Sequence, residues 1–390
     1  MITLPSIVGH TSIESALKHA LKVVSFYEFV PFEEAPTGEQ AVVSGRVMRF
    51  DAKDILFSRR EERRLIPAMR MCIMRGLGDR RTPALLWKIS PGERGTDQVV
   101  LELHAIGMKT AAAEALLITV ADAIAADLGI TDRLIHINSL GVGESSERYL
   151  RELTSFLRKH AADLSNAQRE RMTSDPVGAF LSFASKGALP SRVPSSMDYL
   201  SDEERKHFWD VLEYLELAEK TYELSPLVVG SGDCWARTIF EISRPGEQGR
   251  IPFAFGGRYD ALAAKCINPA AAGVHVGIVF ESPTMPVVKH IVTKPNIYFA
   301  HLGVEAKRRS IPVLEMLRMA HIPVHHSLAF DQLGPQMATV KQLNLPWLVI
   351  MGQKEVREGS ALVRNTKSNA QVSIPIEGLA EYLRRKKAVV

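Results

Sequence analysis

The chain has 390 residues, 46% hydrophobic and 24% charged, which is the composition of a folded protein of two or three domains. Its 48 Lys and Arg against 44 Asp and Glu leave a net charge of +4, too small to indicate polyanion binding by bulk charge. Cys72, Cys234 and Cys266 follow no CxxC spacing, which argues against a disulfide framework or a zinc site. The first residues resemble no secretory signal and no run approaches 18 apolar residues, so we expect a cytoplasmic protein without a membrane span.

The first 139 residues mix helices with strands that are joined by hairpin turns. Apolar residues at helical spacing predict helices at 11–24, 61–75 and 111–128. Apolar runs bounded by turn residues predict strands at 25–33, 84–89, 98–106 and 133–138. Helices and hairpins in this order favour an α+β fold.

The middle of the chain is predicted to be helical, at 145–160, 164–173 and 201–221. Strand patterns return at 236–243 and 272–281. After residue 295 strands and helices alternate, which predicts a separate small α/β domain.

The positive charge gathers in this last part. Residues 304–390 hold 13 Lys and Arg against 7 Asp and Glu, a net of +6, so the rest of the chain carries 4 − 6 = −2. Four of the positive charges are consecutive, and they are candidate nucleic-acid contacts: Arg384, Arg385, Lys386 and Lys387.

Five segments, in order along the chain, resemble motifs of the histidyl-tRNA synthetase family, whose members have a class II aminoacyl-tRNA synthetase core. One of them, GGRYD at 256–260, matches the family letter for letter. The others are RLIHINSLG at 133–141, the stretch 192–222 before the family's histidine loop, DCWARTIFE at 233–241 and LVIMGQKEVRE at 348–358. The resemblance covers nearly the whole chain.

The resemblance implies an antiparallel sheet core with a helical insertion and a C-terminal α/β anticodon-binding domain. It divides the chain into a first core part at 1–143, the insertion at 144–225, a second core part at 226–294 and the anticodon-binding-like domain at 295–390. It also implies a homodimer or a heteromer with a related enzyme, and tRNA as a partner of the last domain.

Three arginines of the family hold ATP and the charge that develops on its α-phosphate, because a planar guanidinium group grips phosphate with two hydrogen bonds. At the three matching positions this chain has Lys88, Gly230 and Phe280, with Val279 in place of a neighbouring acidic residue. Lys88 is instead expected to form an ion pair with Glu102.

The histidine-binding positions differ from the family as well. The family's L-R-P-E-x-T reads LIPAMR here, and its H-Q-x-G-x-E reads HAIGMK. The resemblance therefore implies a degenerate substrate pocket, with substitutions at Ala68, Arg70, Ala105, Lys109, Cys234 and Trp235. Its other members are Glu102, Asp233, Arg237, Gly256, Gly257, Arg258 and Tyr259. Gly256 and Gly257 are expected to supply backbone angles that other residues resist.

The residues that match the family lie on predicted strands and turns, whereas the residues that would bind ATP and histidine are substituted. This pattern favours a protein that no longer charges tRNA. We expect such a protein to act as a tRNA-binding or regulatory subunit without cofactor or metal. One alternative is an active histidine–tRNA ligase with a divergent pocket, which would use ATP and Mg²⁺. Another is the regulatory subunit of ATP phosphoribosyltransferase, against which the retained C-terminal domain argues.

Overall fold

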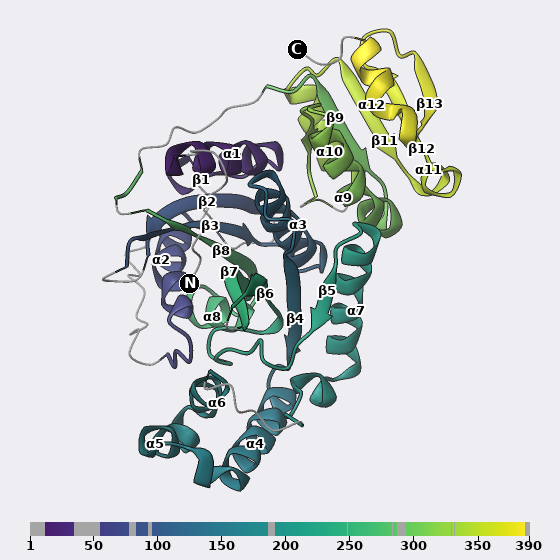
Figure 1. The fold of residues 1–390 in the computed structure, drawn as a ribbon. Coiled ribbons are helices and arrows are strands. Elements are labelled where there is room, and N and C mark those ends of the chain that lie inside the picture. Colours follow the sequence, from purple (N-terminus) through teal and green to yellow (C-terminus); the bar gives the residue numbers. More distant parts are fainter. Residues whose placement is uncertain are drawn as a thin grey trace.

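The computed structural model describes residues 12–34, 55–77, 83–92, 96–185, 192–247, 249–282, 284–286, 294–328, 330 and 332–386. These residues form an eight-stranded sheet and, at the end of the chain, a five-stranded sheet, with helices packed around both (Figure 1). Within these ranges, no helix is long and apolar enough to cross a membrane.

The eight-stranded sheet has the order β1-β2-β3-β8-β7-β6-β4-β5. Its six central strands pair antiparallel, whereas β1 with β2 and β4 with β5 run parallel. This largely antiparallel sheet confirms the predicted α+β core. The strands are β1 (Val30–Pro31), β2 (Ala84–Pro91), β3 (Gln98–Ile106), β4 (Leu134–Leu140), β5 (Tyr222–Leu224), β6 (Arg237–Gly246), β7 (Gly249–Arg258) and β8 (Gly273–Glu281).

The two faces of this sheet have different neighbours, because successive side chains of a strand point to opposite sides. The odd-numbered residues of β3 from 99 to 105 belong to the core that includes α1 (Ile13–Phe26) and α3 (Ala112–Asp127). The even-numbered residues 98 to 104 lie on the opposite face, where a cavity opens and three ionisable side chains gather. Each β3 residue is thereby assigned either to the helix layer or to the cavity side.

Further helices follow β4: α4 (Glu144–Lys159), α5 (Asn166–Ser174), α6 (Pro176–Ala184) and α7 (Asp202–Leu217). The first three lie beyond one end of the sheet, whereas α7 runs alongside the sheet and packs against α3 (Figure 1). Capping boxes start two of them, since Ser165 with Gln168 and Ser201 with Glu204 satisfy free backbone N–H groups. The sequence analysis did not predict α6, which Asp175 caps and Pro176 starts.

The C-terminal sheet has the order β10-β9-β11-β12-β13 and confirms the predicted small α/β unit. β10, β9 and β11 run parallel, while β12 and β13 add antiparallel strands. Its elements are β9 (Ile297–His301), α9 (Val304–Met319), β10 (His325–His326), α10 (Leu333–Gln342), β11 (Trp347–Met351), α11 (Gln353–Glu358), β12 (Ser360–Asn365), β13 (Gln371–Pro375) and α12 (Ile376–Arg385). The four-part division of the chain at residues 143, 225 and 294 remains a prediction.

Two predicted elements near the N-terminus differ from the structure. The strand expected at 25–33 is reduced to β1, because α1 continues to Phe26 and keeps its apolar face buried up to that residue. A 3-10 helix, Phe32–Glu34, follows β1. The helix expected at 61–75 is a 3-10 turn, Glu61–Arg64, followed by α2 (Leu65–Met74). A short helix, α8 (Asp260–Cys266), links β7 to β8.

Helix α9 attaches the C-terminal sheet to the rest of the molecule. The Tyr27 hydroxyl, at the end of α1, donates to Glu315 Oε2 at 2.6 Å. Arg318, one turn further along α9, donates to Asp127 Oδ2 at 2.6 Å, at the end of α3. Because Arg318 also bonds Glu315, the four side chains form one connected network between the two sheets' helices.

Candidate functional site

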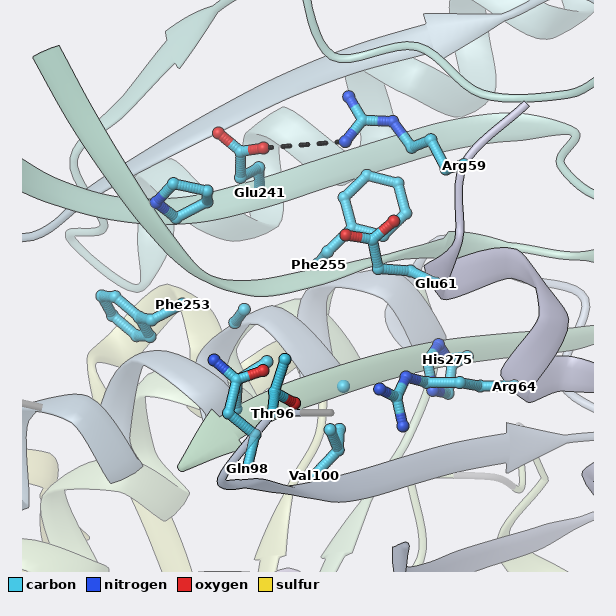
Figure 2. A pocket seen from close by; sticks show the side chains of 14 residues that line it. Arg59, Glu61, Arg64, Thr96, Gln98, Val100, Glu241, Phe253, Phe255 and His275 are labelled. Atoms are coloured by element: carbon cyan, nitrogen blue, oxygen red, sulfur yellow. Dashed lines mark ion pairs between the residues drawn. The ribbon is translucent and has the colours of Figure 1, made fainter. Parts of the chain in front are cut away.

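A cavity of about 200 Å³ opens on the face of the large sheet that is opposite to α1 and α3. Strands β3, β6, β7 and β8 form its floor, and the segment around the 3-10 turn at Glu61–Arg64 forms one wall (Figure 2). It is smaller than the roughly 300–1,000 Å³ of typical small-molecule sites. Its ionisable and amide side chains are Arg59, Glu61, Arg64, Gln98, Glu241 and His275.

The two arginines of the cavity already have partners. Arg59 Nε donates to the Val229 carbonyl at 2.6 Å, and its guanidinium group lies 4.4 Å from the centre of the Phe255 ring and 3.9 Å from Glu241 (Figure 2). Arg64 donates to the Pro91 carbonyl at 2.8 Å. Two arginines face two glutamates here, so the formal charges of the cavity lining balance.

Lys88, at the first of the family's arginine positions, forms the predicted ion pair. It is the register partner of Glu102 across β2 and β3, and its Nζ lies 3.2 Å from Glu102 Oε2. The ammonium group is therefore held by the protein's own carboxylate. It does not belong to the described lining of the cavity.

Gly230, at the second arginine position, has no room for a side chain. A Cβ atom there would lie 2.4 Å from Trp235 Cδ1 and 2.7 Å from Glu62 Oε1. Both neighbours are buried, and both are fixed, because the indole Nε1 donates to Glu62 Oε1 at 2.9 Å. The place of an arginine is thus filled by an indole ring and a carboxylate.

Glu62 is a site residue that the sequence analysis missed. Its carboxylate is buried and accepts hydrogen bonds from the backbone N–H groups of Arg59, at 3.0 Å, and Ser231, at 2.7 Å. Burial raises the pKa of this carboxyl group. In the sequence, the only mark of Glu62 is its place in a pair of glutamates before a predicted helix. The partners of Glu62, at 230–235, lie too far along the chain to be inferred from spacing.

At the third arginine position, β8 turns the two substituted residues to opposite faces. Val279 lines the cavity, whereas Phe280 is buried in the core shared with α1 and α3. An apolar side chain therefore faces the cavity in place of a charged one.

Four substituted positions of the predicted histidine pocket lie outside the described cavity lining. Ala68 and Ala105 are buried in the two apolar cores, and Ala105 faces α1 and α3 because it is an odd-numbered residue of β3. Arg70 and Lys109 are exposed. The structure does not bring these four side chains together around one ligand.

The histidine-loop residues pack beside the cavity and not in it. Cys234 and Trp235 are buried in the core, and Asp233 accepts a hydrogen bond from the Leu56 N–H at 2.8 Å. Arg237 has a φ of 61° and donates to Glu203 at 3.0 Å. These contacts hold the loop against its neighbours.

The GGRYD segment has structural contacts. Neither Gly256 nor Gly257 has a positive φ, so the expectation that they supply unusual backbone angles is wrong. They are required for space, since Cβ atoms there would lie 2.1 Å from the His275 carbonyl oxygen and 2.7 Å from that of Thr238 on the neighbouring strands. Arg258 is fully buried, and its Nε donates to Glu114 at 2.7 Å. Tyr259 is buried beside it.

The basic end of α12 is exposed, although its first arginine has a structural partner. Arg384 donates to the Ala320 carbonyl at 2.5 Å, and Arg385 lies 3.6 Å from Glu381. Lys386 lies over the Tyr382 ring. Lys387 lies outside the described residues.

Comparisons with known proteins agree with this architecture. Residues 296–386 match the model of the anticodon binding domain. The chain is 26% identical over 334 residues to the histidine–tRNA ligase of Caldanaerobacter subterraneus, covering 82% of this chain and 80% of the relative. It is 27% identical to that of Symbiobacterium thermophilum, covering 74% and 68%. The apo histidyl-tRNA synthetase structure of S. aureus has the same fold, with a TM-score of 0.50, 18% identity and coverage of 98% and 99%.

A largely antiparallel sheet followed by an anticodon-binding domain defines a class II synthetase-like protein. Within that class, the chain belongs to the histidyl-tRNA synthetase family.

Proposed function

We propose that this member of the family does not activate histidine and acts as a tRNA-binding or regulatory subunit. The observation that carries the proposal is the filled space at Gly230, where Trp235 and Glu62 take the volume that the family's arginine would need. A guanidinium group from another residue could reach this space only by displacing both Trp235 and Glu62.

The charge of the cavity supports the same proposal. A triphosphate carries several negative charges and needs cations that are free to bind it. Arg59 and Arg64 already bond to carbonyl groups, Glu61 and Glu241 offset their charge, and Lys88 is paired with Glu102. The described residues do not fit ATP with Mg²⁺, and each missing transition-state contact typically costs about 3–4 kcal/mol.

Histidine-dependent exchange of pyrophosphate into ATP tests the proposal directly. We expect the purified full chain to show no exchange above a blank without protein, while the Caldanaerobacter ligase, assayed in parallel, shows it. Robust exchange would establish the alternative, an active ligase with a divergent pocket.

The match of residues 296–386 to the anticodon binding domain, with the net charge of +6 over 304–390, supports tRNA as the partner of the C-terminal sheet. Arg385 and Lys386 are exposed at the end of α12, and we propose that they contact the tRNA backbone.

Replacing both Arg385 and Lys386 by alanine should weaken tRNA binding in a filter assay. It should also reduce the slope of log K against log salt by about 1.4–1.8, since each phosphate contact contributes about 0.7–0.9. Arg151→Ala, which removes an exposed arginine of α4, is the matched control and should change neither quantity. Absence of tRNA binding at low salt would contradict the proposed tRNA contact and favour a regulatory subunit. Light scattering would then show whether that subunit is a homodimer or part of a heteromer.

A further inference from the structure

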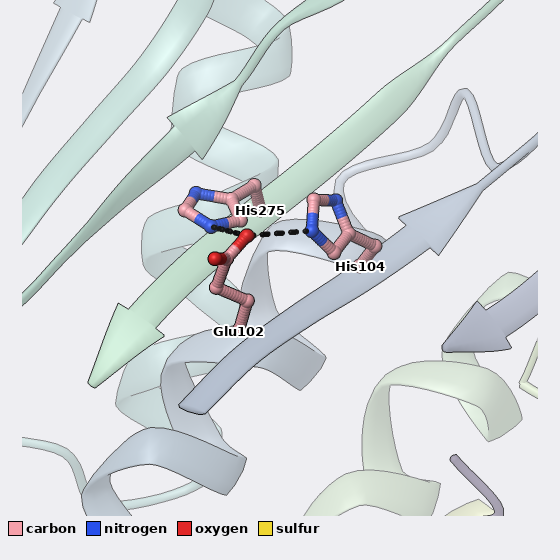
Figure 3. A group of neighbouring side chains, drawn as sticks. All are labelled: Glu102, His104 and His275. Atoms are coloured by element: carbon pink, nitrogen blue, oxygen red, sulfur yellow. Dashed lines mark ion pairs between the residues drawn. The ribbon is translucent and has the colours of Figure 1, made fainter. Parts of the chain in front are cut away.

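Three ionisable side chains converge beneath the cavity. His104 on β3 and His275 on β8 are direct register partners, and Glu102 stands two residues before His104 on the same face (Figure 3). The Glu102 Oε2 atom lies 3.6 Å from His104 Nε2 and 3.9 Å from His275 Nε2. Three ligand atoms from three side chains therefore lie within 4.8 Å of one another.

The histidine nitrogens of this cluster lack the hydrogen bonds that burial normally demands. All three side chains are at most 2% exposed. Within the described part of the chain, His104 Nε2 and both ring nitrogens of His275 have no hydrogen-bond partner, whereas Glu102 Oε2 has the Lys88 ammonium group at 3.2 Å. A buried polar atom without a partner costs about 1–3 kcal/mol, so three such nitrogens in one cluster indicate that the cluster binds a further group.

The residue types of the cluster suit a metal ion. A metal ion binds the neutral imidazole of a histidine and the ionised carboxylate of a glutamate. The three side chains supply two imidazoles and one carboxylate within one buried cluster.

We propose that Glu102, His104 and His275 form a binding site for a divalent transition-metal ion of the Zn²⁺ class. Two imidazoles and a carboxylate form a recognised zinc ligand set that leaves a fourth position open. His275 also lines the cavity, so the cavity provides the entry path and the space for a fourth ligand. Mg²⁺ does not suit the site, because it prefers an octahedron of oxygen atoms.

Neighbouring groups complete the site. The Tyr259 hydroxyl lies 3.5 Å from His104 Nδ1, on the side of the ring away from Glu102, where an outer partner orients a ligating imidazole. Ser90 donates to the other carboxylate oxygen, Oε1. Lys88 is the competitor, since its ammonium group holds the oxygen that a metal would bind and must move aside.

This inference departs from the expectation, drawn from the sequence, that the protein has no metal. Glu102 and His104 are separated by one residue and His275 lies on a distant strand, so no spaced motif marks them. Only the antiparallel pairing of β3 with β8 brings them together.

The test titrates the untagged full chain with Zn²⁺ against a chromophoric chelator, and records the visible spectrum of the Co²⁺ form. We expect one ion per chain. His275→Gln and His104→Gln should each weaken binding by at least about tenfold, since even outer-shell substitutions cost 10- to 100-fold. Lys88→Met should tighten it by removing the competing charge. His136→Gln is the control, because His136 is also a buried strand histidine but lies on β4 beside Ser243.

Two results would overturn the proposal. One is the absence of stoichiometric Zn²⁺ binding by the wild-type chain. The other is binding that neither histidine variant weakens while circular dichroism shows both to be folded. If those variants do not fold, Lys88→Met decides the question, because unchanged Zn²⁺ affinity in that variant would place the ion elsewhere. None of these outcomes depends on aminoacylation or tRNA binding.

Discussion

Replacing Glu114 by alanine should lower the free energy of unfolding by about 3–5 kcal/mol, the cost of leaving a buried charge without its partner. Arg258 is fully buried and donates to both carboxylate oxygens of Glu114. His207 adds a third bond to the same carboxylate, at 2.6 Å. The pair joins β7 to α3, so its loss leaves Arg258 without its main buried partner between the sheet and this helix.

Urea unfolding followed by circular dichroism measures this effect. Lys206→Ala is the control, because its ion pair with Asp210 on α7 is exposed and should contribute no more than about 1 kcal/mol. A loss below about 1 kcal/mol for Glu114→Ala would show that Asp260 and the surrounding carbonyl groups suffice to hold Arg258.

The same substitution should change the acid sensitivity of the protein. Burial alone would raise the pKa of Glu114, but Arg258 and His207 hold it well below its usual value of 4.5. The carboxylate therefore stabilises the fold above pH 4.5, and this contribution is lost as the pH falls below that value. The difference in stability between wild type and Glu114→Ala should narrow in the same range.

The second large effect concerns the filled arginine position. Trp235→Ala should destabilise the protein by about 3–5 kcal/mol, because it leaves a cavity in the core and removes a donor from Glu62. Gly230→Ala should cost about 1–3 kcal/mol by overpacking against the indole. In the double variant Gly230→Ala with Trp235→Ala, the new methyl group no longer meets the indole ring. The double variant should therefore lose about 0.5–3 kcal/mol less stability than the sum of the losses in the two single variants.

Gly334→Ala is the matched control for this cycle. A Cβ at Gly334, in α10, meets no atom within 4 Å, and the substitution should leave stability unchanged or raise it slightly. Strict additivity of Gly230→Ala and Trp235→Ala would mean that the indole does not occupy the space beside Gly230, and would remove the main support for a non-activating protein.

Elements whose residues carry their own pattern could be predicted from the sequence. The strand β3 was predicted at 98–106, where it lies, and α3 was predicted within one residue at each end. α6 was missed, because its short apolar run includes a glycine and directly follows another helix. The strand expected at 25–33 was wrong because packing against the core extends α1 beyond the preference of its last residues.

The site was harder to predict, because its contacts join distant parts of the chain. Lys88 with Glu102 could be foreseen, since one hairpin joins them. Glu62 with Trp235 and His104 with His275 could not, because sequence spacing does not give the register of strands that are far apart. Ala105 could not be placed either, because a match to a family motif does not tell which face of the strand its side chain lies on.

The network of Tyr27, Glu315, Arg318 and Asp127 has a mechanical consequence. A hinge between the two sheets would have to break both the Tyr27–Glu315 bond and the Arg318–Asp127 ion pair at once. Helix α9 therefore opposes rotation of the C-terminal sheet against the large sheet, and substitutions that remove both contacts should loosen the attachment of one sheet to the other.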